Sequence, residues 1–66
     1  MKTFYMTLEE NQSKDRIFCE VEAMEFPTAA SKAYLQRHHL SQKTGNDWRI
    51  LSLSERGWRV VDVSAP

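Results

Sequence analysis

Few side chains in this 66-residue chain could carry out chemistry, and the most suggestive are the adjacent His38 and His39. Histidine binds metal ions and transfers protons near neutral pH. Consecutive residues of a helix point about 100° apart, however, so these two cannot chelate one ion together. Cys19 and a histidine would make a nucleophilic pair only if the thiol were exposed and oriented by a third group. Cys19 lies among the apolar positions of a predicted strand, which argues against that role.

The acidic and glycine residues offer no better catalytic pattern. Glu20 and Glu22 share the exposed face of a predicted strand, and together with Glu25 they do not form a convincing acid–base pair. Gly45 and Gly57 are the only glycines, so no glycine-rich phosphate loop is present. We therefore predict that the protein is not an enzyme and uses no metal or other cofactor.

Length and charge limit what remains. One small domain spans residues 1–66, and a single cysteine excludes an intramolecular disulfide. Small domains of this kind often gain stability from association, so we expect a homodimer or a larger partner. The net charge is zero, but residues 1–31 hold three basic and six acidic side chains and residues 32–66 hold six and three. Such a dipole could steer docking, or the two halves could neutralise each other in the fold.

The N-terminal residues do not resemble a signal peptide, because Met1-Lys2-Thr3-Phe4-Tyr5 leads into an alternating pattern. No segment approaches the roughly 20 apolar residues that a membrane span requires. We expect a cytoplasmic protein without membrane contact.

The hydrophobic period changes from two to about 3.6 and back to two along the chain. Residues 2–9 and 16–24 alternate, residues 28–42 have helical spacing, and residues 48–53 and 58–63 alternate again. This order predicts an α+β fold of two layers, β-β-α-β-β, with a four-stranded antiparallel sheet and one helix on one face.

The first hairpin and the helix should supply the core. The strand positions expected to face the helix are Phe4, Met6, Leu8, Ile17, Cys19, Val21 and Ala23. The polar residues 10–15 form the turn between these strands. Thr28 is predicted to cap the helix and Gly45 to end it. The expected buried arc of the helix contains Ala29, Ala30, Ala33, Tyr34 and Leu40, with Arg37 extending its head to water.

The second hairpin is predicted to turn at Ser54-Glu55-Arg56-Gly57, with Gly57 at the left-handed position. Strict alternation then places Leu51, Leu53, Val61 and Val63 on one face, and Trp48, Ile50, Trp58 and Val60 on the other. Because one helix covers only one side of a sheet, an apolar face should remain open and act as an interface. The predicted partner-binding residues are Trp48, Ile50, Arg56, Trp58, Arg59, Tyr5 and Phe18. A register slip would reverse these faces, and the helix surface Lys32, Leu35, His39 and Lys43 would then be the competing site.

Nucleic-acid binding is an alternative use of the same sheet face. Aromatic side chains can stack on bases, and Arg49, Arg56 and Arg59 lie near Trp48 and Trp58 in the sequence. Nucleic-acid-binding domains usually carry an excess of basic residues, which this neutral chain lacks.

Three segments together resemble a known group of proteins. They are a strand ending Glu20-Val21-Glu22-Ala23, a helix opening Ala29-Ala30-Ser31-Lys32-Ala33, and a last strand Trp58-Arg59-Val60-Val61-Asp62. This layout is similar to that of small anti-CRISPR proteins of phages. The resemblance implies a non-catalytic protein that occupies a surface of a nucleic-acid-guided defence complex. No motif matches position by position, so no residue role is carried over, and the neutral charge departs from acidic inhibitors that mimic DNA.

The sequence thus predicts a small interaction protein that binds and blocks a larger protein or nucleoprotein complex, as a phage or prophage anti-defence factor. Two alternatives stay open: a small nucleic-acid-binding module, and a homodimeric structural or assembly factor.

Overall fold

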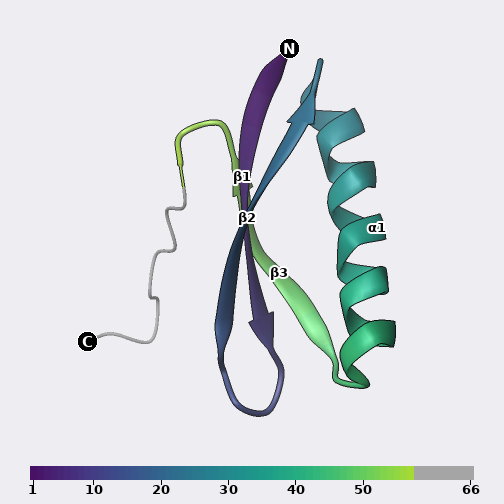
Figure 1. Cartoon of the computed structure of the whole chain (residues 1–66). Helices are drawn as coiled ribbons and strands as arrows, with labels where there is room; N and C mark the ends of the chain where they lie inside the picture. The colour runs from purple at the N-terminus through teal and green to yellow at the C-terminus, as the bar shows by residue number, and fades with distance from the viewer. Residues whose placement is uncertain (58–66) are drawn as a thin grey trace, which may run out of the picture.

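The computed structural model describes residues 1–57 and shows a small α+β fold of three strands and one helix (Figure 1). The elements are β1 (Lys2–Glu10), β2 (Arg16–Ala23), α1 (Phe26–Thr44) and β3 (Trp48–Ser54). The sheet is antiparallel with the order β2-β1-β3. The β-β-α-β part of the prediction is confirmed, whereas the predicted fourth strand at residues 58–63 lies outside the described residues.

The first hairpin pairs β1 with β2 in the expected register, and Leu8 lies opposite Ile17. Its turn is stabilised by the Glu10 carboxylate, which accepts hydrogen bonds from the backbone N–H groups of Gln12 and Ser13. Lys14 adopts a φ of 65°, in the left-handed region that tight turns often use. The polar segment predicted as a turn therefore closes the hairpin.

The register of β3 corrects the predicted faces of that strand. Ile50 pairs with Leu8 and Leu53 pairs with Met6, with a register shift between Thr7 and Leu8. A β-bulge inserts one extra residue and so breaks the two-residue alternation. Both Ile50 and Leu53 consequently pack on the core, although strict alternation places them on opposite faces.

Trp48 and Ile50 were predicted on the open face, and that placement is wrong. Trp48 is only 8% exposed and belongs to the core, and the partly buried Ile50 packs beside it. The indole N–H of Trp48 donates to the Thr44 hydroxyl at 3.0 Å, which satisfies its polar atom. The Trp48 carbonyl in turn accepts a hydrogen bond of 3.2 Å from Arg37. These contacts join β3 to the C-terminal half of α1.

The helix starts earlier than expected. Glu25, rather than Thr28, is the N-cap residue, it makes no side-chain cap hydrogen bond, and Pro27 occupies the first turn. Proline is favourable there because the first helical N–H groups have no partner within the helix. The predicted end is confirmed: Gly45 has a φ of 73°, and its N–H donates to the Ser41 carbonyl at 2.9 Å.

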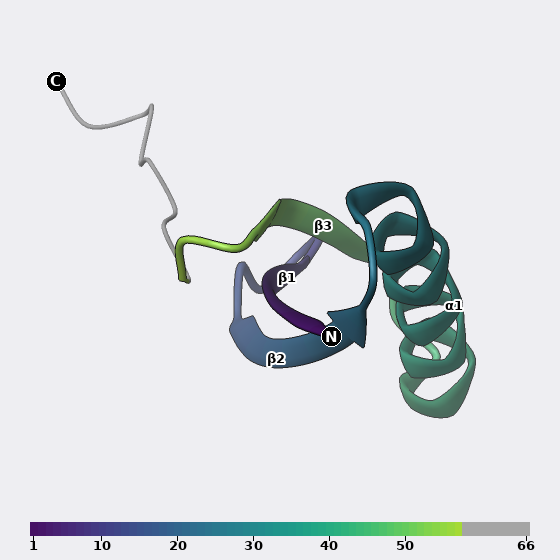
Figure 2. The ribbon, with the colours of Figure 1, turned by 90° about the horizontal axis from the view of Figure 1, so that it is seen from above.

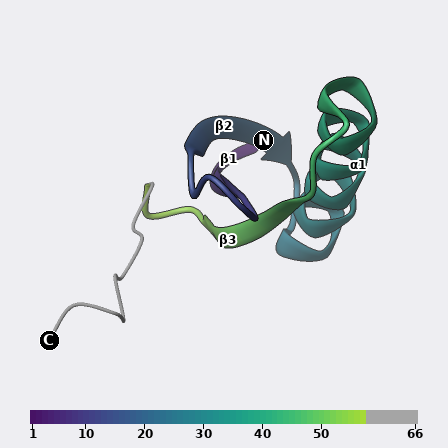
Figure 3. The same ribbon diagram turned by 90° about the horizontal axis from the view of Figure 1, so that it is seen from below.

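The core lies between α1 and one face of the sheet, as the views from above and below show (Figures 2 and 3). Ala29 and Ala33 are fully buried, so the helix approaches the strands closely. The core is completed by Phe4, Met6, Leu8, Val21, Ala23 and Trp48. Tyr34, predicted in the buried arc, is 61% exposed, because the shorter alanines bring the helix close to the sheet and leave the larger ring at the rim.

Candidate interaction surface

The face of the sheet turned away from α1 forms what we call the open face. The register places on it Tyr5, Thr7 and Glu9 of β1, Arg16, Phe18, Glu20 and Glu22 of β2, and Arg49, Ser52 and Ser54 of β3. No helix or strand within residues 1–57 covers this face. Its side chains point away from α1, and those that β2 contributes are exposed.

A buried carboxylate organises one end of the open face. Glu9, on the central strand, is only 4% exposed. Its Oε1 accepts hydrogen bonds from Arg49 Nη2 at 2.6 Å and Arg49 Nε at 3.2 Å. Its Oε2 accepts a hydrogen bond of 3.3 Å from Arg16 Nε. One acidic side chain thus connects all three strands and holds two guanidinium groups in place.

The same contacts set the ionisation of Glu9. The hydrogen bond from Arg49 lowers the pKa of the Glu9 carboxyl, burial opposes this, and Arg16 lowers it further. The carboxylate therefore stays charged at neutral pH, and the cluster of Glu9, Arg16 and Arg49 carries one net positive charge. Because both arginines keep exposed surface, this end of the open face presents positive charge to a partner.

The centre of the open face contains two neighbouring hydroxyl groups. Thr7 and Ser52 lie opposite each other in the β1–β3 register. Both side-chain oxygens are buried, and neither has a hydrogen-bond partner within residues 1–57. A buried hydroxyl without a partner usually reduces stability. Thr7 and Ser52 therefore form a polar centre of the open face.

The predicted aromatic residues of the first hairpin lie on the open face. Phe18 is opposite Thr7 and is 53% exposed, which is unusual for a large apolar ring. Tyr5 is half-buried on the same face, opposite Glu20. Phe18 therefore provides apolar contact area between the basic end at Glu9 and an acidic end at Glu20 and Glu22.

The remaining predicted contact residues are not gathered on this face. Trp48 and Ile50 belong to the core. Arg56 is exposed in the turn after β3, where its N–H donates to the Ser54 hydroxyl at 3.0 Å and Gly57 has a φ of 104°. This positive φ confirms the predicted backbone conformation of Gly57, whereas the second strand of the predicted hairpin lies outside the described residues. Trp58 and Arg59 lie outside the described residues.

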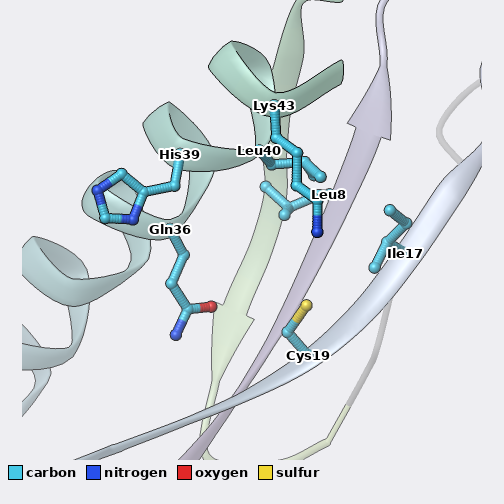
Figure 4. Close-up of a pocket in the computed structure, with 7 residues that line it drawn as sticks. All are labelled: Leu8, Ile17, Cys19, Gln36, His39, Leu40 and Lys43. Atoms are coloured by element: carbon cyan, nitrogen blue, oxygen red, sulfur yellow. The ribbon is translucent and has the colours of Figure 1, made fainter.

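The competing helix surface is also exposed. Leu35 is 56% exposed, and Lys32 donates a 2.6 Å hydrogen bond from Nζ to the Glu22 carbonyl. His39 and Lys43 line a groove of about 260 Å³ between α1 and β2 (Figure 4). The other lining residues are Leu8, Ile17, Cys19, Gln36 and Leu40. The helix surface thus borders an apolar groove rather than a charged pocket.

Within residues 1–57, no three His, Cys, Asp or Glu side chains converge as metal ligands. No helix in that part of the chain is long and apolar enough to cross a membrane. Comparison with protein-family models, curated proteins and solved structures finds no match to this chain.

Sequence reasoning missed the cluster of Glu9, Arg16 and Arg49, although Arg49 was named among the basic residues of the nucleic-acid alternative. A signal for the first two was present, because the first-hairpin alternation places Glu9 and Arg16 on one face at opposite positions. Arg49 could not be added, since its position opposite Glu9 depends on the pairing of β1 with β3 across 40 residues.

Proposed function

We propose that this protein is a small non-enzymatic interaction protein that binds and blocks a larger protein or nucleoprotein complex through its open face. The observation that carries the proposal is the buried Glu9, which fixes Arg16 and Arg49 beside the exposed Phe18 ring. Arginine and large aromatic side chains are enriched at protein interfaces. Arginines held in place before binding lose little side-chain entropy when a partner docks.

The distribution of charge on the open face favours a protein surface over bare nucleic acid. Arg16 and Arg49 lie at one end, while Glu20 and Glu22 lie toward the other end of β2. A phosphate backbone would be attracted to the first pair and repelled by the second. A protein partner can match both signs, which would also fix the orientation of docking.

A nucleic-acid-binding module remains the second candidate function, because Phe18 and Tyr5 lie on the same face as Arg16 and Arg49. That arrangement resembles the stacking surfaces of single-strand binders in composition. It predicts binding that weakens steeply with salt, whereas a protein complex with a matched surface depends less on ionic strength.

The narrower proposal, a phage or prophage anti-defence factor, rests on the layout of strands and helix described from the sequence. It includes a fourth strand at residues 58–63, paired with the outer edge of β3. A groove of about 280 Å³ lies between α1 and β3 and is lined by Phe26, Tyr34, Leu51 and Leu53 among others.

The test compares two apolar side chains of similar exposure on different surfaces. Tagged wild-type protein, Phe18→Ala and the control Leu35→Ala are used to capture partners from lysate of a bacterium carrying a nucleic-acid-guided defence complex. A partner retained by wild type and Leu35→Ala but lost with Phe18→Ala supports the open face. Loss with Leu35→Ala alone would move the site to the helix, and loss after nuclease treatment would favour nucleic acid.

Blocking is tested separately from binding. In cells whose nucleic-acid-guided defence prevents phage plaques, expression of the wild-type protein should restore plaque formation and Phe18→Ala should not. If the wild-type protein captures a partner but the cells still prevent phage plaques when it is expressed, the protein binds without blocking, and the blocking role is refuted.

A further inference from the structure

The outer edge of β2 is an unusual feature of the fold. β2 lies at one end of the sheet and pairs only with β1 within residues 1–57. The groove between β2 and α1 lies directly beside this edge, and Figure 4 shows the Cys19 sulfur pointing into it. Ile17 and Cys19 are only partly buried, although they are on the face that packs against the core. An edge strand beside incompletely covered apolar side chains can accept another strand.

The sequence of β2 is complementary to itself when it is reversed about Cys19. In an antiparallel pair of two copies, Arg16 of one protomer would lie opposite Glu22 of its partner, and the reverse pair would form at the other end. Ile17 would lie opposite Val21, and Cys19 opposite Cys19. Arg16 and Glu22 are both exposed. Within residues 1–57, Arg16 bonds to Glu9 through its Nε alone, so its terminal N–H groups can donate to a second carboxylate.

We propose that two copies of this chain associate through β2, antiparallel, with the twofold axis at Cys19. The two three-stranded sheets then join into one continuous sheet, with both helices on the same side. Two Arg16–Glu22 ion pairs flank the axis on the open face. On the helix side, the pairs of Ile17 with Val21 and of Cys19 with Cys19 cover the apolar mouth of the groove.

Other registers of the same strand are less favourable. A shift by one residue would place the apolar face of one copy beside the polar face of the other, because side chains alternate with a period of two. An axis at Phe18 keeps opposite charges together but places the buried Val21 opposite Asp15, at the polar turn. Only the axis at Cys19 matches both the charges and the apolar positions.

The stability that a small domain gains by burying more surface also favours a second copy of this chain as the partner. A domain of 66 residues has a small core, and association is a common way for such domains to gain buried surface. The partner here needs an apolar strand with a positive and a negative side chain at the two ends, in reverse order. β2 of another copy provides this without any further component.

The experiment uses two matched charge reversals on one face of β2. Glu22→Lys replaces both proposed ion pairs with repulsion, whereas Glu20→Lys makes the same charge change opposite Phe18. Sedimentation equilibrium in reductant should show a dimer for the wild type. The dissociation constant should rise about tenfold or more for Glu22→Lys and much less for Glu20→Lys. Circular dichroism confirms that both variants are folded.

Cys19 reports on the register independently. Opposite residues of antiparallel strands have Cα atoms about 4.5–5.5 Å apart, within the range that a disulfide spans. Diamide, which takes up the two electrons and two protons of a pair of thiols, should convert the dimer to a covalent one. Burial raises the pKa of the Cys19 thiol, so the reaction is run near pH 9. Cys19→Ser should remain non-covalent while still dimerising.

Three results would overturn the proposal. The first is a wild-type monomer at millimolar concentration. The second is a dimer that neither weakens with Glu22→Lys nor forms the Cys19 disulfide, which would place the contact on another surface. The third is a dimer disrupted by Glu20→Lys without disulfide formation, which would move the axis to Phe18.

Discussion

Trp48 provides the sharpest test of the fold, because the same residue would have a different role if its face were reversed. It is 8% exposed, and a buried tryptophan removes about 150–250 Å² from water. At about 25 cal/mol per Å², this burial stabilises the fold by roughly 4–6 kcal/mol. Tryptophan-to-alanine changes in cores typically cost about 3–5 kcal/mol. A domain of this length has about 3–10 kcal/mol in total, so Trp48→Ala should lose most of it.

The two parts of the Trp48 interaction can be separated. Trp48→Phe keeps much of the apolar contact but removes the indole N–H that donates to Thr44 at 3.0 Å, and it should cost about 1–2 kcal/mol. Thr44→Val removes the same hydrogen bond from the other side, together with the bond that the hydroxyl donates to the Leu40 carbonyl and the one it accepts from the Asn46 N–H. Because the Trp48 bond is shared, the double variant should cost less than the sum of the two single changes. Thr44→Ser, which keeps the hydroxyl, is the control.

Urea unfolding followed by circular dichroism measures these differences, since it does not depend on which tryptophan fluoresces. The reasoning is refuted if Trp48→Ala unfolds with a free energy within about 1 kcal/mol of the wild type and merely loses a binding partner. That outcome would mean that Trp48 is a surface contact residue.

Three further changes test the polar groups and the helix end. Arg49 and Arg16 lower the folded-state pKa of Glu9 below 4.5, so its ion pairs stabilise the fold above that pH and are lost as the pH falls through the lower folded value. Glu9→Gln should therefore reduce the difference between the urea midpoints at pH 5 and pH 2. An unchanged difference would contradict the role of the Glu9 cluster. Thr7→Val removes a buried hydroxyl that has no partner among the described residues, so thermal unfolding should show about 1 kcal/mol of added stability. A clear loss of stability would indicate a partner for that oxygen. Gly45→Ala has room for the methyl group, but the alanine must adopt a φ of 73°. Chemical denaturation should therefore show a loss of about 1–2 kcal/mol in the free energy of unfolding. An unchanged free energy would show that the helix end can rearrange.

The open face and the β2 edge use different parts of the same strand. Phe18 and Arg16 project to one side of the sheet, whereas pairing through β2 uses the backbone at its edge. A dimer joined at β2 would bring two open faces into one continuous surface, with the two sets of Arg16 and Arg49 at diagonally opposite ends of it. A blocking protein of this size would thereby present about twice the contact area, and binding through two linked sites strengthens attachment.

Local sequence patterns were enough for most individual elements. The alternation of residues 2–9 and 16–24 correctly identified both strands and the face of each that packs on the helix. Gly45 and Gly57 marked a helix end and a turn because each adopts a positive φ, which glycine permits without a steric penalty. These features depend on the residues themselves and on neighbours a few positions away, so the sequence alone predicts them.

Tertiary structure decided the features that depend on pairing between distant segments. The bulge in β3 and the buried side of Trp48 arise from how β3 lies along β1 and beneath the end of α1. The Glu9 cluster likewise exists only because that pairing brings Arg49 to a residue 40 positions earlier. Alternation within a strand determines which residues share a face, but contact with the rest of the fold determines which face is buried and where the alternation breaks.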